Sequence, residues 1–269
     1  MTLDSRSSNH VRRMGCILLV AIFVFTGIGF AEEKPAGAAK DEHKAHWSYE
    51  GDTGPDKWGD MSAEQGVCKT GKAQSPVDIK TTKQANKKTA YKVSYKASPL
   101  KIINNGHTIQ VNYEPGSTIT IDGKTYQLLQ FHFHDPSEHT VLGKSYPMEL
   151  HLVHKNDKGE LAVLGVFMKE GKENATIKTL WDNLPDKVNE EKSVPAVSVN
   201  ASTLLPKMNN LVVYRGSLTT PPCSEGVSWN VVKTPIEVSK AQIDKFISVS
   251  GKNARPVQPL NDRQLQETK

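Results

Sequence analysis

The stretch STITIDGKTYQLLQFHFH, residues 117–134, alternates apolar and polar side chains on both sides of a short IDGK segment. An Asp-Gly pair between two alternating runs is a strong signal for a β-hairpin. Successive side chains of a strand point to opposite faces, so His132 and His134 share one face. Phe131 and Phe133 then point the other way. The stretch therefore predicts a strand with a hydrophobic core under one face and two imidazoles on the other.

Other segments of the chain carry the same strand signals. They are rich in Val, Ile, Thr and Tyr, are separated by turns such as EPG and NDKG, and start at residues 91, 100, 148 and 160 (YKVSY, LKIINNGHTIQVNY, MELHLVHKN and ELAVLGVFMK). Residues 217–238 suggest a loop that leads into a further strand. Residues 173–184 and 239–249 look helical, and Ser239 is a suitable N-cap. Repeated hairpins favour a single, mostly β (α+β) domain: a large central, mostly antiparallel twisted sheet with short peripheral helices.

Composition and length are those of an ordinary folded protein. The chain has 269 residues, of which 37% are hydrophobic and 23% charged, enough for one large domain with a sizeable core. The formal net charge of +5 is spread along the chain. The sequence contains no dense Lys/Arg block with interleaved aromatics, so we expect no nucleic-acid partner.

The N-terminus has the pattern of a secretory signal. Arg12 and Arg13 precede an apolar run over residues 16–31, and small residues precede a cleavage site predicted after Ala31. The alternative is an uncleaved anchor, but the run is shorter than the roughly 20 residues that span a bilayer. We therefore expect a signal peptide over 1–31, a flexible leader over 32–45 and no stable membrane span after cleavage. The product would be exported, either periplasmic or secreted.

Without the signal, the chain keeps two cysteines, Cys68 and Cys223. In an exported protein an even pair of cysteines suggests one disulfide. Two unrelated buried thiols are the alternative, because sequence alone does not show that the two sulfurs meet.

A third histidine belongs with His132 and His134. In the strand that begins at residue 148, Glu149, His151 and Val153 share one face. If this strand pairs antiparallel with the first, the three imidazoles converge. Three neutral histidines with a fourth position open are typical of a catalytic zinc site. Hydrogen-bonded core histidines are the alternative.

Neighbouring residues fit around this cluster in different ways. Gln130 and Glu149 share the ligand face and are candidates to accept the second ring N–H of His132 and His151. They are equally compatible with a solvated cleft. His154 has the wrong parity for the cluster, and His139 follows a turn and is expected to be structural.

Beyond these residues, the sequence resembles the alpha-class carbonic anhydrases, in particular exported bacterial ones. The resemblance covers roughly residues 46–265, the expected catalytic domain. It rests on motifs that occur in order between residues 74 and 263: QSPVDI, NNGH, QFHFH, SEHT, ELHLVH, LAVLG, GSLTTPPC and RPVQPLNDR. It implies zinc-dependent, reversible hydration of carbon dioxide to bicarbonate and a proton. A noncatalytic zinc- or ligand-binding module on the same fold, or a zinc carrier, is the alternative.

The resemblance also implies roles for individual residues. His132, His134 and His151 are the zinc ligands. Thr219 accepts a hydrogen bond from zinc-bound hydroxide, Glu138 accepts the threonine's own proton, and His107 is the proton shuttle, because an unperturbed imidazole with a pKa near 7 works in both directions.

Further positions match the walls of the family's cavity. Those of the apolar carbon dioxide pocket are Val153, Val163, Leu218, Val227 and Trp229, with Thr220 at its border; those of the ordered water chain are Tyr49, Asn105 and Gln110. Gln110 departs from the family pattern, in which asparagine is usual. Cys68 and Cys223 match the bacterial disulfide. The family also implies inhibition by sulfonamides, and a homodimer is compatible with the sequence.

Overall fold

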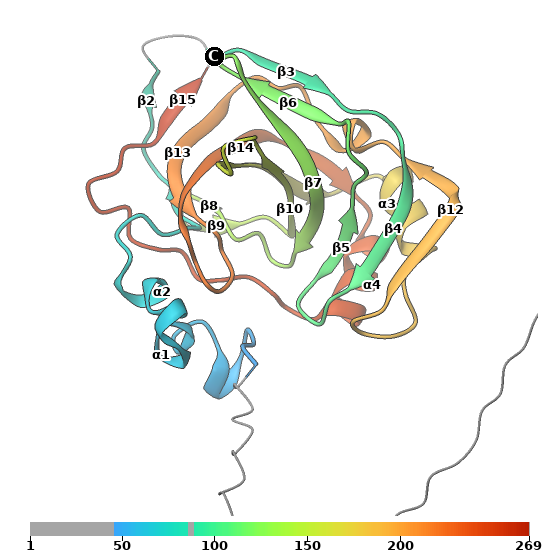
Figure 1. Ribbon diagram of the computed structural model, residues 1–269, viewed down its shortest axis with the longest axis horizontal. Helices are drawn as coiled ribbons and strands as arrows, with labels where there is room; N and C mark the ends of the chain where they lie inside the picture. Colours follow the sequence, from blue (N-terminus) through green and yellow to red (C-terminus); the bar gives the residue numbers. More distant parts are fainter. Residues whose placement is uncertain (1–45, 86–88, 269) are drawn as a thin grey trace, which may run out of the picture. The chain divides into compact units, whose positions relative to one another are not determined.

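The computed structural model of the protein describes residues 46–85 and 89–268. The predicted signal peptide (1–31) and leader (32–45) lie outside these residues. Within them, one twisted sheet dominates, and its strands run in the order β12-β4-β5-β7-β10-β11-β14-β13-β15-β2 (Figure 1). Two further strands of the same sheet branch from β7, because β6 pairs with β7 and β3 pairs with β6. The large central sheet predicted from the sequence is confirmed.

The elements have the following bounds. The main sheet contains β2 (Lys83–Gln84), β3 (Tyr91–Ser94), β4 (Ser98–Asn104), β5 (Ile109–Asn112), β6 (Thr118–Ile121), β7 (Lys124–His134), β10 (Met148–Lys155), β11 (Leu161–Glu170), β12 (Glu191–Val199), β13 (Leu211–Ser217), β14 (Glu225–Val238) and β15 (Gln266–Thr268). A small sheet contains β1 (Asp78–Ile79), β8 (Thr140–Val141) and β9 (Lys144–Ser145). The helices are α1 (Trp58–Met61), α2 (Val67–Thr70), α3 (Ala175–Trp181) and α4 (Lys240–Ser250), with 3-10 turns at Gly51–Thr53, Ala63–Gln65 and Ala201–Leu204.

Most neighbouring strands of the main sheet are antiparallel, as predicted. The exceptions are the parallel pairs β11–β14 and β15–β2. The IDGK hairpin joins β6 to β7 with Ile121 opposite Lys124, and Asp122 and Gly123 both have positive φ (48° and 83°). This backbone is the one that a two-residue hairpin loop requires, and it favours Asp-Gly.

The register of β7 against β10 places the histidines. His132 lies opposite His151, and His134 lies opposite Glu149. Because opposite residues of an antiparallel pair share a face, the three imidazoles meet on one side of the sheet. The predicted parity is confirmed, and His154 lies on the other side, where its Nε2 is 2.6 Å from the Tyr95 hydroxyl.

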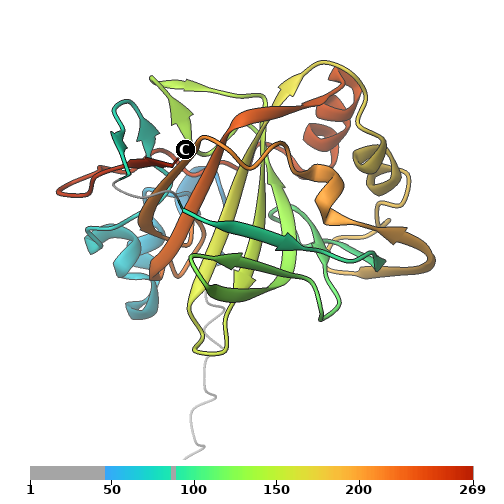
Figure 2. The same ribbon diagram turned by 90° about the horizontal axis from the view of Figure 1, so that it is seen from above.

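The opposite face of β7 is buried under helices. Phe131 and Phe133 are fully buried, and the Phe133 ring packs edge-on against Trp181 of α3 at 5.1 Å. Trp181 in turn stacks on Phe246 of α4 at 5.9 Å, and α3 and α4 lie side by side (Figure 2). The aromatic core therefore stiffens the strand that carries two of the three histidines.

The predicted helices are both present, with one difference in length. Ser239 caps α4 in a capping box with Gln242, as expected. The first helix was predicted over 173–184 but extends only over Ala175–Trp181, with Asn174 as its cap. Pro185 excludes Leu184 from the helix, because a residue before proline is driven out of the helical region.

Two longer strands, β12 and β13, were not predicted, and neither were the two- and three-residue strands β1, β2, β8, β9 and β15. β12 is an edge strand whose ladder against β4 is interrupted between Val194 and Ser198, around Pro195. Proline has no N–H to donate and is found at such edges, so it obscured the strand signal. β13 was missed as well, although it lies inside the sheet between β14 and β15.

The predicted disulfide is present: Cys68 and Cys223 are joined, with their Cα atoms 5.0 Å apart. The bond packs against Trp58 in a small aromatic cluster. Among residues 46–85 and 89–268, none of the helices has the length and apolar character needed to cross a membrane.

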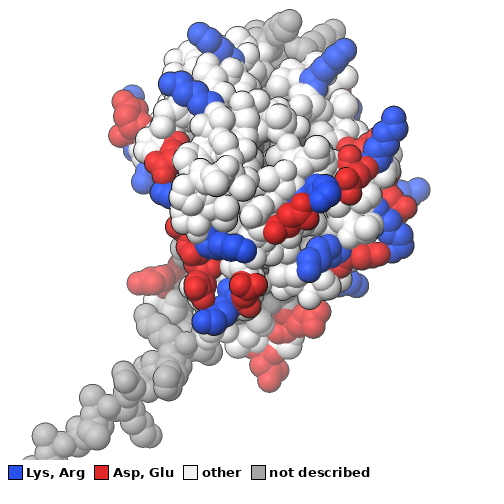
Figure 3. Space-filling view, turned by 90° about the vertical axis from the view of Figure 1, so that its right-hand side faces the viewer, with Lys and Arg blue, Asp and Glu red and all other residues white. Residues whose placement is uncertain are grey.

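Charges on the surface are mixed in sign. On the face shown in Figure 3, Lys and Arg side chains are interspersed with Asp and Glu. Exposed ion pairs such as Lys178–Asp182 and Lys240–Asp244 lie on α3 and α4. Such pairs contribute little stability, typically below about 1 kcal/mol each.

Candidate metal centre

His132, His134 and His151 converge at one point of the sheet. One ring nitrogen from each lies within 4.8 Å of the others. The ring centroids are 5.0 Å apart for His132–His134, 5.4 Å for His132–His151 and 4.5 Å for His134–His151. This grouping of imidazoles, proposed above from strand parity, can hold a metal ion.

Each ring is oriented by a hydrogen bond from its outer nitrogen. His132 Nδ1 donates to Gln130 Oε1 (2.8 Å), and His151 Nε2 donates to Glu149 Oε1 (3.0 Å). His134 Nδ1 donates to the Asn253 carbonyl (2.8 Å). Such bonds fix the tautomer and leave Nε2 of His132, Nε2 of His134 and Nδ1 of His151 as the lone-pair atoms. Gln130 and Glu149 thus lie where the sequence suggested.

The donor set fits a cation such as zinc. His134 Nε2 and Glu138 Oε2 are both buried and have no hydrogen-bond partner among the described residues. Burial, together with the neighbouring imidazoles, lowers the pKa of His132 and of His134, so both rings favour the neutral, ligating form. Unpartnered buried lone pairs are costly unless something binds them, and a metal ion does so.

A chain of buried hydrogen bonds fixes the Glu149 carboxylate. Its Oε1 accepts from His139 Nδ1 (2.8 Å) and its Oε2 accepts from the His139 backbone N–H (2.9 Å). His139 Nε2 lies 2.7 Å from the Tyr214 hydroxyl, which lies 2.8 Å from Ser75 Oγ. His139 is therefore a structural residue, as expected, and fixes the carboxylate that orients His151.

The charge of Glu149 is stabilised by this arrangement. Burial alone would raise the pKa of Glu149, but the imidazoles of His139 and His151 outweigh burial and hold it well below the ordinary value. Gly165 lies opposite His151 on β11, and a Cβ there would be 2.8 Å from Glu149 Oε1. The glycine is thus required for the close approach of the carboxylate to the backbone of β11.

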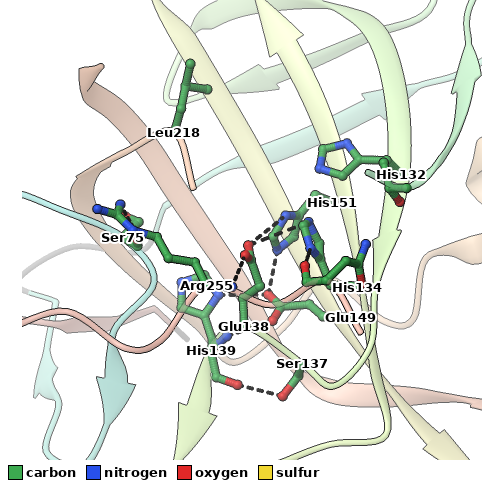
Figure 4. Close-up of polar contacts among 12 residues, drawn as sticks. Ser75, His132, His134, Ser137, Glu138, His139, Glu149, His151, Leu218 and Arg255 are labelled. Atoms are coloured by element: carbon green, nitrogen blue, oxygen red, sulfur yellow. Dashed lines mark hydrogen bonds and ion pairs between the residues drawn. The ribbon is translucent and has the colours of Figure 1, made fainter. Parts of the chain in front are cut away.

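Glu138 lies on the inner side of the three imidazoles. Its Oε1 accepts from the backbone N–H of Arg255 (2.9 Å), while Oε2 lies 3.5 Å from His134 Nε2 and 3.8 Å from His151 Nδ1 (Figure 4). Thr219 is buried in the loop after β13. No hydrogen bond between Thr219 and Glu138 is found among the described residues.

An apolar wall stands beside the centre. Val163, Val227 and Trp229 are buried in one cluster, and Val153 and Leu218 pack against it. The Trp229 ring is 4.8 Å from the His151 ring, and its Nε1 donates to the Ser217 carbonyl (2.9 Å). The structure thus brings together the five positions matched to the carbon dioxide pocket. Thr220 follows in the same loop, and its carbonyl accepts from the Cys223 N–H.

The positions matched to the shuttle and the water chain lie around Asn105–Gln110. Asn105 Oδ1 accepts from the backbone N–H of His107 (3.0 Å). Gln110 pairs with His132 in the register of β5 against β7, but its amide donates to Asn112 Oδ1 (2.7 Å). The Tyr49 ring lies edge-on to the His107 ring at 6.4 Å.

His107 itself differs from the sequence expectation of an unperturbed imidazole. Its ring stacks on Trp47 with centroids 3.6 Å apart, and its Nε2 lies 2.8 Å from His46 Nε2. Burial, and then the neighbouring His46, lower the pKa of His107 to about 4.

Two residues at the site carried no role in the sequence analysis. Asn253 connects the segment of His107 to the end of β7. Its side chain donates to the His107 and Phe133 carbonyls (both 2.9 Å), and its own backbone carbonyl accepts from His134. Arg255 is a buried cation that donates to Gln74, Ser75 and Cys68. The RPVQPLNDR motif begins at Arg255 and was the available signal, but its contacts are all distant in sequence.

Comparisons with known proteins agree with one another. The eukaryotic-type carbonic anhydrase family model matches residues 53–269. A carbonic anhydrase of Nostoc sp. is 42% identical over 261 residues, which are 96% of this chain and 97% of the relative. A hyperthermostable carbonic anhydrase from a hydrothermal vent chimney is 51% identical with a TM-score of 0.78, and covers 83% of this chain and 100% of its own. The alpha-carbonic anhydrase of Thermovibrio ammonificans, solved with the inhibitor sulfanilamide, is 45% identical with a TM-score of 0.77, covering 82% and 99%.

The sheet and its three converging imidazoles define a candidate metalloprotein with an all-histidine centre. The family match and the relatives at more than 40% identity are then specific: the chain belongs to the eukaryotic-type, or alpha, carbonic anhydrase family.

Proposed function

We propose that His132, His134 and His151 hold a zinc ion at the reaction centre of this carbonic anhydrase. The reaction is the reversible hydration of carbon dioxide to bicarbonate and a proton. The observation that carries the assignment of the metal is the set of three converging, outward-tethered imidazoles with a buried, unpartnered His134 Nε2. Neutral imidazoles leave a bound cation its full charge, whereas thiolate or carboxylate ligands would reduce it.

Zinc supplies a Lewis acid that lowers the pKa of a coordinated water to about 7, a value established for carbonic anhydrases as a class. The ligand histidines in turn keep their tautomers through Gln130, Glu149 and the Asn253 carbonyl.

Thr219 and Glu138 orient the nucleophile in this proposal. An ionised carboxylate is acceptor-only, so Glu138 accepts a hydrogen bond from the Thr219 hydroxyl. The threonine oxygen is then left to accept a hydrogen bond from the O–H of the attacking oxygen, which aims the lone pair of that oxygen at the substrate. The free Oε2 of Glu138 supports this role, because Oε1 is already engaged by Arg255.

Carbon dioxide is held by the apolar wall. Val153, Val163, Leu218, Val227 and Trp229 offer it a surface without hydrogen-bonding groups beside the imidazoles. Thr220 borders this pocket. His107 carries the released proton away, and Tyr49, Asn105 and Gln110 border the water path that reaches it.

The proposal includes binding of sulfonamide inhibitors and export of the protein from the cytoplasm. The relative from Thermovibrio ammonificans was solved with sulfanilamide, which supports sulfonamide binding here. The Cys68–Cys223 disulfide supports export, periplasmic or secreted. The signal peptide over 1–31, the leader over 32–45 and the catalytic domain over 46–265 complete the proposal.

The test is removal and return of the metal. Protein stripped by a chelator should lose carbon dioxide hydration and regain it with one equivalent of zinc. A chelated protein that stays fully active would contradict the proposal. A zinc-binding protein without hydration activity would instead support the noncatalytic module.

A further inference from the structure

His46 and His107 form a direct imidazole–imidazole contact at the edge of the site. Their Nε2 atoms lie 2.8 Å apart, which is hydrogen-bond distance, and their ring centroids are 4.7 Å apart. His107 is only partly exposed and its ring is fixed by the stack on Trp47, whereas His46 is exposed to solvent. The sequence analysis assigned no role to His46.

A proton shuttle at His107 alone meets a difficulty. Burial and the nearby His46 lower the pKa of His107 to about 4. The transfer of a proton to His107 from a group with a pKa of about 7 would then be unfavourable by a factor of about one thousand. Fast turnover needs an acceptor that does not keep the charge in this half-buried position.

We propose that His46 is a second relay group, which takes the proton from His107 and passes it to the buffer. This inference rests on the proposed function, because it extends the path that begins at the metal centre. A proton arriving at Nδ1 of His107 is balanced by the loss of the Nε2 proton to His46 Nε2. His46 then releases its own Nδ1 proton to a buffer base, so that neither ring keeps a net charge.

The surroundings of His107 favour this direction. Among the described residues that contact its ring, the titratable ones are His46 and Tyr49, and burial keeps the pKa of Tyr49 well above the ordinary value, so this phenol stays neutral. The backbone of His107 is held by Asn105 and Asn253. His46 is therefore the imidazole in hydrogen-bond contact with His107 that can exchange a proton with it, and it is exposed to solvent.

The decisive variant is His46→Gln. Glutamine can keep a hydrogen bond to His107 but cannot carry a proton. We expect kcat for hydration in dilute, weakly accepting buffer to fall about three- to tenfold, within the range that general acid–base groups contribute. The ratio kcat/KM should stay unchanged, because it reports the steps up to bicarbonate release, and added imidazole should restore kcat. Oxygen-18 exchange at chemical equilibrium measures the same proton transfer independently.

Controls separate the relay from other effects. His43→Gln removes an imidazole from the same stretch of sequence and should leave kcat unchanged. The double variant His46→Gln/His107→Ala should be no slower than His107→Ala, because His46 lies downstream of His107. If His46→Gln keeps full kcat in dilute buffer while His107→Ala loses it, His46 is not a relay and the proposed function stands. Loss of kcat/KM, or loss that imidazole does not restore, would also overturn the relay.

Discussion

Glu149 and His151 lie two positions apart on one face of β10, and Glu149 Oε1 accepts a 3.0 Å hydrogen bond from His151 Nε2. The same oxygen accepts from His139 Nδ1 (2.8 Å). One carboxylate oxygen accepts both hydrogen bonds, and this is why a buried negative charge is tolerated beside the three imidazoles. The orientation of His151 therefore depends on a group that never touches the substrate.

We predict that Glu149→Gln weakens zinc binding by roughly 10- to 100-fold, the usual cost of losing such a partner. The amide places N–H groups against the ring or the backbone N–H of His139, so at least one buried donor is left unsatisfied. Competition with a chromogenic chelator measures the affinity. Glu114→Gln is the matched control, since Glu114 pairs with Lys101 at the surface. Equal affinities of the two variants would show that Glu149 does not support the centre.

The Cys68–Cys223 bond closes a loop with a sequence separation of 155 residues. In the chain-entropy description, removing it costs up to about 5 kcal/mol of unfolding free energy. We therefore expect Cys68→Ser/Cys223→Ser to unfold at a clearly lower urea concentration than the oxidised protein. Reductant should lower the midpoint of the wild type and leave the variant unaffected. A variant with the wild-type midpoint would mean that the covalent link adds nothing to stability.

His154 predicts an acid-sensitive contribution to stability. It is fully buried, and burial lowers its pKa to about 4. The unfolded chain binds this proton near pH 6.5, so stability due to His154 is complete above pH 6.5 and is lost as the pH falls toward 4. The difference between the pKa of His154 in the unfolded and the folded chain corresponds to about 3 kcal/mol of unfolding free energy.

The double variant Tyr95→Phe/His154→Phe removes this titration without leaving the Tyr95 hydroxyl unpartnered. Its melting temperature should fall less than that of the wild type between pH 6.5 and 4. Tyr95→Phe alone should keep the wild-type pH dependence, because His154 stays buried. Parallel melting curves for all three proteins would exclude His154 as the cause.

Most of the fold could be predicted from local sequence patterns. Alternation around IDGK defined the β6–β7 hairpin, and parity placed His132, His134 and His151 on one face, because strand geometry has a strict period of two. The edge strand β12 could not be predicted in the same way, since Pro195 interrupts it and its pairing with β4 involves residues far apart in sequence. The helix predicted over 173–184 is longer than α3, and Pro185 accounts only for the exclusion of the residue before it.

The site was predictable where it follows from strand register and not where it depends on long-range packing. Gln130 and Glu149 could be predicted because they lie on the same strand face as the histidines that they orient. The carbonyl of Asn253 that orients His134, and the backbone of Arg255 that holds Glu138, come from more than 115 residues away. The lowered pKa of His107 likewise depends on Trp47 and His46, whose contacts appear only once the chain is folded.

X-ray absorption spectroscopy of the zinc-loaded protein tests the central claim most directly. Three imidazole nitrogens and one light-atom ligand from solvent at about 2.0–2.1 Å are predicted, and the imidazole signal should weaken in His134→Ala. A fourth protein ligand, a sulfur scatterer, or a spectrum unchanged in His134→Ala would contradict a centre formed by His132, His134 and His151.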